Sequence, residues 1–245
     1  MGRGVVRKPV VLAIIPARGG SKSVPRKNLR MFCGQPLIVH SINVARHVSM
    51  IDRCVLSTDD SEIAEVAKAH GAEVPFLRPK ELAEDNTLDL PVFQHTLTWL
   101  RDQEDYQPDV VVHLRPTSPL RTSTHVAESL NLLLTNPEAD SVRAVTIPAH
   151  NPFKMWEQVD GYLRPLMKWK NSEPYNAPRQ ELPVIYWQNG YVDVTRVATI
   201  LEKRSMTGDR ILPYLIDTAF PVDLDSIEGF EMAEMIVKRY GMKLA

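Results

Sequence analysis

A cationic, glycine-containing segment follows the first apolar run of the chain. Residues 10–15 are mostly β-branched and apolar, in the length of a strand that is buried on both faces. Pro16 ends this run, residues 18–22 read Arg-Gly-Gly-Ser-Lys, and residues 26–28 read Arg-Lys-Asn. Glycines let backbone amides approach phosphate oxygens, and arginine and lysine neutralise their charge. The segment therefore predicts a phosphate-binding loop, with a surface turn of solvated cations as the alternative.

The spacing of these glycines differs from that of the two commonest phosphate loops. A Walker loop needs Gly, four spacers and then Gly-Lys-Ser/Thr, and a dinucleotide fingerprint needs G-x-G-x-x-G. Neither pattern occurs in residues 16–28. A P-loop ATPase and a dinucleotide-dependent dehydrogenase are therefore not indicated.

Two further groups of polar residues could do chemistry. Asp223 and Asp225 form an Asp-x-Asp, and in an extended chain both carboxylates point to the same side. Such a pair suits Mg²⁺ that bridges phosphates, with a helix N-cap as the alternative. Residues 115–121 (RPTSPLR) bring two hydroxyls, two prolines and two arginines to the end of a predicted strand, as a rigid polar rim.

An alternation of strands and helices must position these groups. Expected strands cover residues 10–15, 53–57, 73–76, 109–114, 141–147, 186–194 and 211–216. Expected helices cover residues 36–48, 62–69, 91–100, 125–134 and 195–203, and a last one runs from after Glu228 to about Tyr240. Alternation of this kind predicts an α/β fold with a mostly parallel central sheet, whose ligands bind beyond the carboxyl ends of the strands.

The alternation breaks between residues 151 and 183. Two short β segments flank Asp160-Gly161, which is a good hairpin signal. Large apolar side chains are numerous there, and a projection usually buries such groups against a partner. We expect a main domain of residues 9–150 and 184–245 and a protruding arm of residues 151–183, with packing inside one chain as the alternative.

Bulk composition excludes several classes of protein. Hydrophobic residues make up 44% and charged residues 24% of the 245 residues, which is ordinary for a soluble globular protein. The net charge of −1 gives no support to a nucleic-acid partner, and no apolar run is long enough for a membrane span. Cys33 and Cys54 have no CxxC spacing, so neither a disulfide framework nor a zinc site is indicated. We expect a cytoplasmic protein.

Several motifs resemble those of one enzyme family. Residues 17–28 (ARGGSKSVPRKN) are similar to the signature loop A-R-x-x-S-K-x-x-P-x-K-N of the CTP-using acylneuraminate cytidylyltransferases, which make CMP-sialic acid and related CMP-nonulosonates. Residues 78–87 resemble the family element R-P-x-x-L-A-x-D-x-T, and residues 178–183 resemble P-R-Q-x-L-P. The resemblance covers residues 11–237 with the motifs in the same order.

This resemblance implies a Rossmann-like nucleotidyltransferase fold, a homodimer formed by the arm, and transfer of CMP from CTP to the anomeric hydroxyl of an acidic 2-keto sugar, with release of pyrophosphate. It implies Mg²⁺ (with Mn²⁺ as an alternative) held by Asp223 and Asp225, which match the family's I-D-I-D. The catalytic cations would be Arg18, Lys22 and Lys27. The other nucleotide-binding candidates are Ala17, Gly19, Gly20, Ser21, Asn28, Ser57 and Arg78, and the sugar-binding candidates are Arg115, Thr117, Ser118, Arg179 and Asn189.

The sequence departs from the family pattern in the sugar-binding part. Arg115 stands where the family's L-Q-P-T-S-P-L-R has glutamine, and Tyr191 and Asp193 depart from N-G-A-I-Y-I. A guanidinium only donates hydrogen bonds, whereas an amide donates and accepts. The candidate acceptors are then sialic, legionaminic or pseudaminic acid, with another acid such as a deoxy-octulosonate or a phosphonate as the alternative. A GT-A-like glycosyltransferase and a non-catalytic nucleotide-binding dimer are the remaining alternatives.

Overall fold

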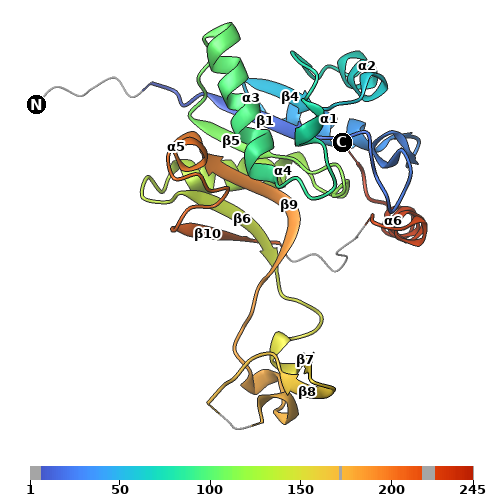
Figure 1. Ribbon diagram of the computed structural model, residues 1–245, viewed down its shortest axis with the longest axis vertical. Coiled ribbons are helices and arrows are strands. Elements are labelled where there is room, and N and C mark those ends of the chain that lie inside the picture. Colours follow the sequence, from blue (N-terminus) through green and yellow to red (C-terminus); the bar gives the residue numbers. More distant parts are fainter. Residues whose placement is uncertain (1–6, 171–172, 217–223, 245) are drawn as a thin grey trace, which may run out of the picture.

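A computed structural model describes residues 7–170, 173–216 and 224–244, and its centre is a six-stranded sheet (Figure 1). The strands are β1 (Val11–Pro16), β4 (Arg53–Ser57), β5 (Val110–His113), β6 (Ser141–Thr146), β9 (Trp187–Arg196) and β10 (Ile211–Leu215). Their order across the sheet is β10-β6-β9-β5-β1-β4. β1 runs parallel to β4 and β5, and β10 runs parallel to β6, whereas β9 is antiparallel to both of its neighbours. The predicted α/β fold with a mostly parallel sheet is confirmed.

Helices cover both faces of this sheet. The helices are α1 (Leu37–Arg46), α2 (Ser61–Ala69), α3 (Asp89–Glu104), α4 (Ser123–Leu134), α5 (Val197–Leu201) and α6 (Ile227–Tyr240). α1, α2, α4 and α6 contribute to one apolar cluster, and α3 and α5 contribute to a second cluster on the opposite face. Polar side chains begin three of the helices, since Asp60, Thr122 and Ser226 each accept a hydrogen bond from a backbone amide in the first turn. Among the described residues, no helix has the length and apolar character that crossing a membrane requires.

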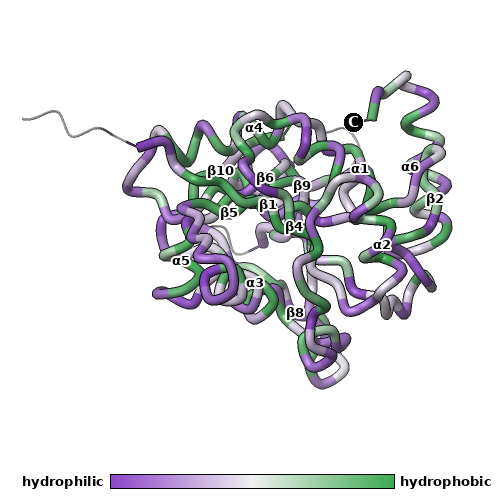
Figure 2. The backbone as a smooth tube through the Cα atoms, turned by 90° about the horizontal axis from the view of Figure 1, so that it is seen from above, coloured by the Kyte–Doolittle hydropathy of each residue, from purple (hydrophilic) through white to green (hydrophobic). Residues whose placement is uncertain are grey.

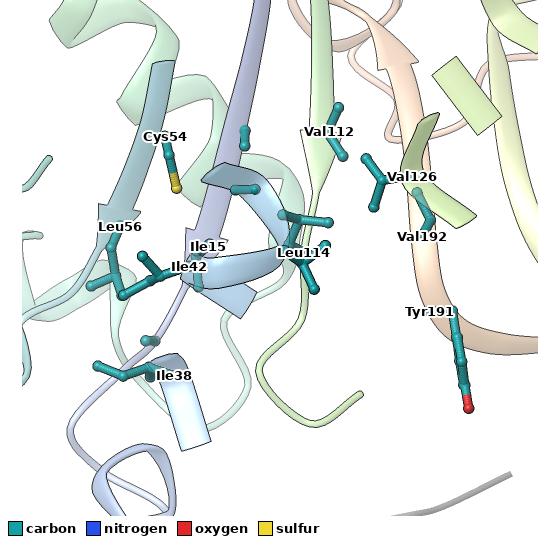
Figure 3. Packing of buried hydrophobic residues seen from close by; sticks show 14 of the residues in the cluster. Ile15, Ile38, Ile42, Cys54, Leu56, Val112, Leu114, Val126, Tyr191 and Val192 are labelled. Atoms are coloured by element: carbon teal, nitrogen blue, oxygen red, sulfur yellow. The ribbon is translucent and has the colours of Figure 1, made fainter. Parts of the chain in front are cut away.

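Alternate residues of the strands divide between the two clusters. In β1, Ile15 packs in the first cluster and Ile14 in the second, as side-chain alternation along a strand requires. Figure 3 shows Ile38 and Ile42 of α1 against the strand residues of the first cluster. In Figure 2, hydrophobic residues follow the central strands, and hydrophilic residues prevail on peripheral segments. The carboxyl ends of β1, β4 and β5 are thereby fixed side by side.

Two predicted elements differ from the structure. The expected strand at 73–76 is wrong, because only Glu73 forms a bridge, with Val55, and Pro75 has no amide hydrogen to continue a ladder. The expected helix at 195–203 begins later, because Thr195 and Arg196 continue β9 and pair with β5. The helix therefore starts only at Val197, where the pairing stops.

The hairpin prediction is confirmed. β7 (Trp156–Val159) and β8 (Tyr162–Pro165) pair antiparallel, and Asp160 and Gly161 between them both have positive φ angles, of 52° and 82°. Short 3-10 turns complete this part of the chain at Pro152–Lys154, Pro174–Asn176 and Arg179–Glu181. Figure 1 shows the hairpin projecting well away from the sheet. We call residues 151–183 the arm.

The arm exposes several large apolar side chains. Tyr162 and Leu163 are 77% and 66% exposed, and Leu166 and Trp156 are also exposed. Other aromatic groups pack within the arm, since the rings of Phe153 and Trp169 lie 5.5 Å apart. The arm thus has a small core of its own and an unburied apolar surface in the single chain.

Candidate active site

A cavity of about 540 Å³ lies beyond the carboxyl ends of β1 and β5. This is the position that open α/β sheets use for ligands. Ten of the predicted site residues line the cavity: Arg18, Gly20, Ser21, Lys22, Lys27, Asn28, Arg78, Arg115, Thr117 and Asp225. The sheet therefore brings together groups that are up to 207 residues apart in the sequence, from Arg18 to Asp225.

The backbone at the start of the predicted phosphate loop is held against the end of β4. The Ala17 amide donates to the carbonyl of Ser57 at 2.9 Å, and the Gly19 amide donates to Asp59 Oδ1 at 2.9 Å. A Cβ atom on Gly19 would lie 2.7 Å from Asp60 Oδ2, so this close approach requires glycine. Ala17 is buried, and neither Ala17 nor Gly19 lines the cavity. Their part is to fix the path of the loop.

The three predicted catalytic cations of this loop pair with carboxylates from distant segments. Arg18 lies 2.9 Å from Asp85, and Lys22 contacts the other oxygen of the same carboxylate. Lys27 pairs with Asp225, which precedes α6. The hydrogen bond from Lys22 is the main cause that lowers the pKa of Asp85. The cations of the loop thus line the cavity, and their partners Asp85 and Asp225 are exposed carboxylates that a ligand anion could replace.

Two further residues of the nucleotide-binding set shape the same end of the cavity. Asn28 donates to the carbonyl of Arg18 at 2.9 Å. Arg78 is buried and donates Nε to Ser57 Oγ at 3.0 Å and Nη1 to the carbonyl of Leu82 at 3.3 Å. Burial lowers the pKa of Arg78 to about 10, so the guanidinium stays charged at neutral pH. Ser57 is buried beneath Arg78 and orients it, and it does not line the cavity.

The segment after β5 forms the opposite wall and is fixed by a buried arginine. Arg121 donates to the carbonyl of Tyr191 and to Ser41 Oγ, both at 2.6 Å, and to the carbonyl of Arg115 at 3.3 Å. Burial lowers the pKa of Arg121 to about 9. Ser118 Oγ donates to the carbonyl of Gly190 at 3.1 Å. These bonds hold the turn against β9 and leave Arg115 and Thr117 at the cavity.

Asn189 belongs to this support as well. Its Oδ1 accepts from the Tyr191 amide at 3.1 Å, across Gly190, whose φ of +73° favours glycine. A Cβ atom at Gly190 would lie 3.4 Å from Ser118 Oγ. Neither Ser118 nor Asn189 lines the cavity. Both residues shape the wall that carries Arg115.

Arg115 itself is bound by two carboxylates that the sequence analysis did not select for the site. Its Nη1 donates to Asp193 of β9 at 2.6 Å, and its Nη2 donates to Asp89 of α3 at 3.3 Å. His113, two residues earlier, is buried at the cavity and has no hydrogen-bond partner among the described residues. Burial lowers the pKa of His113 well below its usual value, so the imidazole is neutral. The sequence signal for Asp193 was an acidic residue between two valines of an expected strand.

Comparison with known proteins agrees with this geometry. A family model described as cytidylyltransferase matches residues 12–233. The chain belongs to the cytidylyltransferase family. It is therefore a nucleotidyltransferase, and the predicted resemblance is confirmed.

Relatives of this cytidylyltransferase act on several sugars. It is 31% identical over 229 residues to the pseudaminic acid cytidylyltransferase of Campylobacter jejuni. The match covers 93% of this chain and 96% of the relative. It is 31% identical over 230 residues to the CMP-N,N'-diacetyllegionaminic acid synthase of Legionella pneumophila, with the same coverage. It is 30% identical over 229 residues to the N-acylneuraminate cytidylyltransferase of Escherichia coli O18:K1:H7. There the match covers 94% of this chain and 52% of the longer relative.

Solved structures show the same fold. The CMP:2-keto-3-deoxy-manno-octonic acid synthetase complexed with CTP superposes with a TM-score of 0.70 at 15% identity, over 94% of this chain and 99% of that one. The 4-diphosphocytidyl-2C-methyl-D-erythritol synthase of Anaerococcus prevotii superposes with a TM-score of 0.61 at 12% identity, over 95% and 100%. At these identities the likeness concerns the fold of this cytidylyltransferase.

One predicted site residue of the cytidylyltransferase lies on the arm, and another falls outside the described residues. Arg179 lies on the arm, where its Nη2 donates to the carbonyl of Pro148 at 2.9 Å, and it lines two smaller hollows there. Asp223 falls outside the described residues. Asp225, its predicted metal-binding partner, lines the cavity with its side chain 65% exposed.

The donor set at the cavity suits a magnesium ion that is bound mainly by substrate. Among the described residues, no group of three or more His, Cys, Asp or Glu is placed to hold a metal on its own. Mg²⁺ in nucleotide sites usually takes one or two carboxylates together with phosphate oxygens and waters. Asp225 is an exposed carboxylate beside Lys27 of the predicted phosphate loop, so it fits this role.

Proposed function

We propose that this cytidylyltransferase transfers CMP from CTP to the anomeric hydroxyl of an acidic 2-keto sugar of the sialic, legionaminic or pseudaminic acid type and releases pyrophosphate. The observation that carries the proposal is one cavity that is lined both by the cations Arg18, Lys22 and Lys27 and by Arg115. The first set suits a triphosphate, and the second suits a sugar carboxylate. The names of the relatives support the same class of acceptor.

The nucleotide half of the site would hold the triphosphate with Arg18, Lys22 and Lys27. Each of these side chains lines the cavity and now shares its charge with a carboxylate from another segment. Gly20 and Ser21 line the cavity beside them, and the loop is fixed through Ala17 and Gly19. Asn28, and Arg78 oriented by Ser57, would contact the nucleobase or ribose.

The acceptor half would use Arg115 and Thr117, with Ser118 and Asn189 supporting them from behind. The anomeric oxygen of the acceptor attacks the α-phosphorus of CTP, and the bond from that phosphorus to the bridging oxygen breaks. Pyrophosphate leaves with the bonding electrons, and the acceptor hydroxyl loses its proton. Such transfer depends on positioning and on neutralising charge, which Arg18, Lys22 and Lys27 provide at the leaving group.

Asp223 and Asp225 would hold Mg²⁺, or Mn²⁺, at the phosphates. When bound, the ion would reduce the negative charge that an attacking oxygen meets. Lys27, which pairs with Asp225, would orient its carboxylate. The single-chain geometry supports the Asp225 part of this proposal.

The arm would join two copies of the chain, with residues 9–150 and 184–245 as the main domain. Its exposed Tyr162, Leu163 and Leu166 support an apolar contact. Arg179 would then meet the substrate in the site of the neighbouring copy. Light scattering tests this part: replacing Tyr162 and Leu163 by serine should convert a dimer to a monomer, and an unchanged mass would contradict it. We also propose a cytoplasmic enzyme without a nucleic-acid or membrane partner.

A second acceptor class is favoured by the donor-only guanidinium of Arg115. A deoxy-octulosonate or a phosphonate would also present an anion to it. Both acceptor classes would use the same nucleotide half of the site. One assay with CTP and different acidic acceptors therefore separates them.

The test is pyrophosphate release from each of the four NTPs with Mg²⁺ and a panel of acidic sugars. We expect release with CTP and one nonulosonic acid. Release only with the octulosonate or phosphonate would select the second class. Release without preference for CTP would contradict both, and CTP binding without turnover would indicate a non-catalytic nucleotide-binding protein. Transfer of a sugar from a nucleotide to a second sugar would indicate a glycosyltransferase.

A further inference from the structure

A buried carboxylate lies between two arginines at the acceptor end of the cavity. Asp193 is 3% exposed, its Oδ2 accepts from Arg115 Nη1 at 2.6 Å, and its Oδ1 accepts from Arg143 Nε at 3.1 Å. Arg143 also donates Nη1 to Gln188 Oε1 at 2.9 Å. Both oxygens of Asp193 are therefore occupied by charged donors, which are the strong kind of hydrogen bond.

The position of Asp193 is fixed by the sheet on both sides. In β9 it lies opposite His113 of β5 and opposite Arg143 of β6. Arg115 follows His113 by two residues, just past the end of β5. The carboxylate thus belongs to a strand that is paired on both sides, whereas Arg115 begins a turn.

The two arginines and Asp193 together carry one net positive charge. Of the three, Arg115 lines the cavity. Two of its five N–H donors are used by Asp193 and Asp89, which leaves donors for a ligand. The Asp89 carboxylate is 44% exposed and 3.3 Å away, so a ligand anion can replace it at small cost, unlike Asp193.

We propose that Asp193 is a positioning residue that holds the Arg115 guanidinium for the carboxylate of the acceptor, and that Arg115 and Asp193 act as one unit in acceptor selection. This inference rests on the proposed function. Arg143 anchors the far side of Asp193 and prevents the carboxylate from turning away. The unit joins positions 115 and 193, two of the three positions at which the chain departs from the motifs that it otherwise resembles.

The experiment compares Asp193→Asn, Arg115→Gln and the double variant. Values of KM and kcat are measured separately for CTP and for the acceptor that the wild type prefers, with N-acetylneuraminic acid as the first probe. Asp193→Asn should raise the acceptor KM at least about tenfold, because a charged hydrogen bond is lost, and should change the KM for CTP less than about twofold. The double variant should be no worse than Arg115→Gln alone, because the pair acts as a unit.

A second substrate separates positioning from a general structural defect. The carboxamide of the acceptor lacks the anion, so the penalty from Asp193→Asn should fall to within about twofold for it. Arg143→Gln keeps the Arg115 pair and should give a smaller rise in acceptor KM, which keeps the test open if Asp193→Asn does not fold. Asp140→Asn is the matched control. It also removes a buried carboxylate paired with a cation, but Asp140 does not line the cavity, so acceptor KM should be unchanged.

Equal losses for CTP and acceptor, additive effects in the double variant, or the same penalty on the carboxamide would overturn the inference. Calorimetric titration of the acceptor in the presence of CTP separates this result from failure of the proposed function. Binding of an acidic sugar that weakens in Asp193→Asn, without turnover in any protein, would contradict the proposed function and support the inference. No binding and no turnover of any acidic sugar by the wild type would overturn both.

Discussion

The two ends of the cavity hold their cations in different ways. At the nucleotide end, the side chains of Asp85 and Asp225 that pair with the loop are 43% and 65% exposed. At the acceptor end, Arg115 pairs with Asp193, which is almost fully buried. Exposed ion pairs contribute roughly 0–1 kcal/mol and exchange partners easily, whereas removing one partner of a buried pair costs several times more. The nucleotide end is thus suited to accept a highly charged ligand, and the acceptor end to hold one donor in a fixed direction.

This difference follows from the elements that carry the charges. Asp85 lies in a loop and Asp225 precedes α6, whereas Asp193 lies within β9. A loop carboxylate can move when a phosphate arrives. The backbone that carries the Asp193 carboxylate is fixed by its pairing with β5 and β6, and two arginines hold the carboxylate itself.

Replacing Lys27 should have the largest effect. Its side chain is nearly buried at the cavity and pairs with Asp225. Lys27→Ala should lower kcat/KM at least about a hundredfold, since neutralisation of the leaving pyrophosphate is lost, and should leave the circular dichroism spectrum intact. Lys8→Ala is a suitable control, because Lys8 pairs with Asp52 away from the cavity. A near-normal rate for Lys27→Ala would remove this residue from the phosphate site.

Replacing Arg115 should have the next largest effect, and only at the acceptor end. Arg115→Gln should change the ratio of kcat/KM between two acidic acceptors about tenfold or more, because an amide replaces a charged donor. The apparent affinity for CTP should stay within about twofold. Competition assays between acceptor pairs measure the ratio directly. A larger change for CTP than for the acceptor would place this residue in the nucleotide end.

The effect of burial on the strength of an ion pair can also be tested through stability alone, on Asp140, a buried carboxylate that does not line the cavity. Asp140 accepts from Lys203 Nζ at 2.8 Å and from the amides of Asp209 and Arg210 at 2.9 and 3.1 Å, and these bonds, that of Lys203 first, lower the pKa of Asp140 well below its usual value. A depressed pKa gives stability that is present above about pH 4, the unfolded value, and is lost as pH falls toward the folded value. Asp140→Asn should therefore unfold at lower urea than the wild type at pH 7, with a smaller difference at pH 3.

The control for that measurement is Asp102→Asn, because Asp102 is half exposed beside Arg101. It should shift neither urea midpoint appreciably. Equal shifts for Asp102→Asn and Asp140→Asn would mean that burial does not govern the strength of these pairs.

Asp85 should show the smallest effect and the opposite sign. Its carboxylate pairs with Arg18 and Lys22 and competes with any phosphate for them. Asp85→Asn should lower the KM for CTP by no more than about threefold, as expected for an exposed pair. Initial rates over a range of CTP concentrations measure this. A KM more than tenfold higher would mean that Asp85 contributes to nucleotide binding instead.

Local sequence patterns predicted the parts of the site that one segment makes. The loop after β1 and the Asp160-Gly161 turn depend on neighbouring residues. Pairing across the sheet, in contrast, depends on residues that are far apart in the sequence. The bonds of Arg115 to Asp193 and Asp89 span 78 and 26 residues, so they required the order and register of the strands.

Two other features have the same cause. Arg78 follows the short segment 73–76 in a loop, but it is buried on Ser57, 21 residues earlier. Residues 73–76 had a strand-like composition, but the sheet edge accepts only a single bridge there. In both cases the tertiary environment, which composition does not specify, decided the outcome.

β9 begins shortly after the arm and enters the sheet, so one strand links the projection to Asp193, which holds Arg115. Added or deleted residues in the arm can be absorbed outside the sheet. A single insertion between Asp193 and Arg196 cannot, because β9 pairs there in regular register, and a one-residue slip would turn a valine toward the arginines and the carboxylate toward the core. For protein engineering, the arm is the part that can be exchanged, and the spacing along β9 is the part that must be kept.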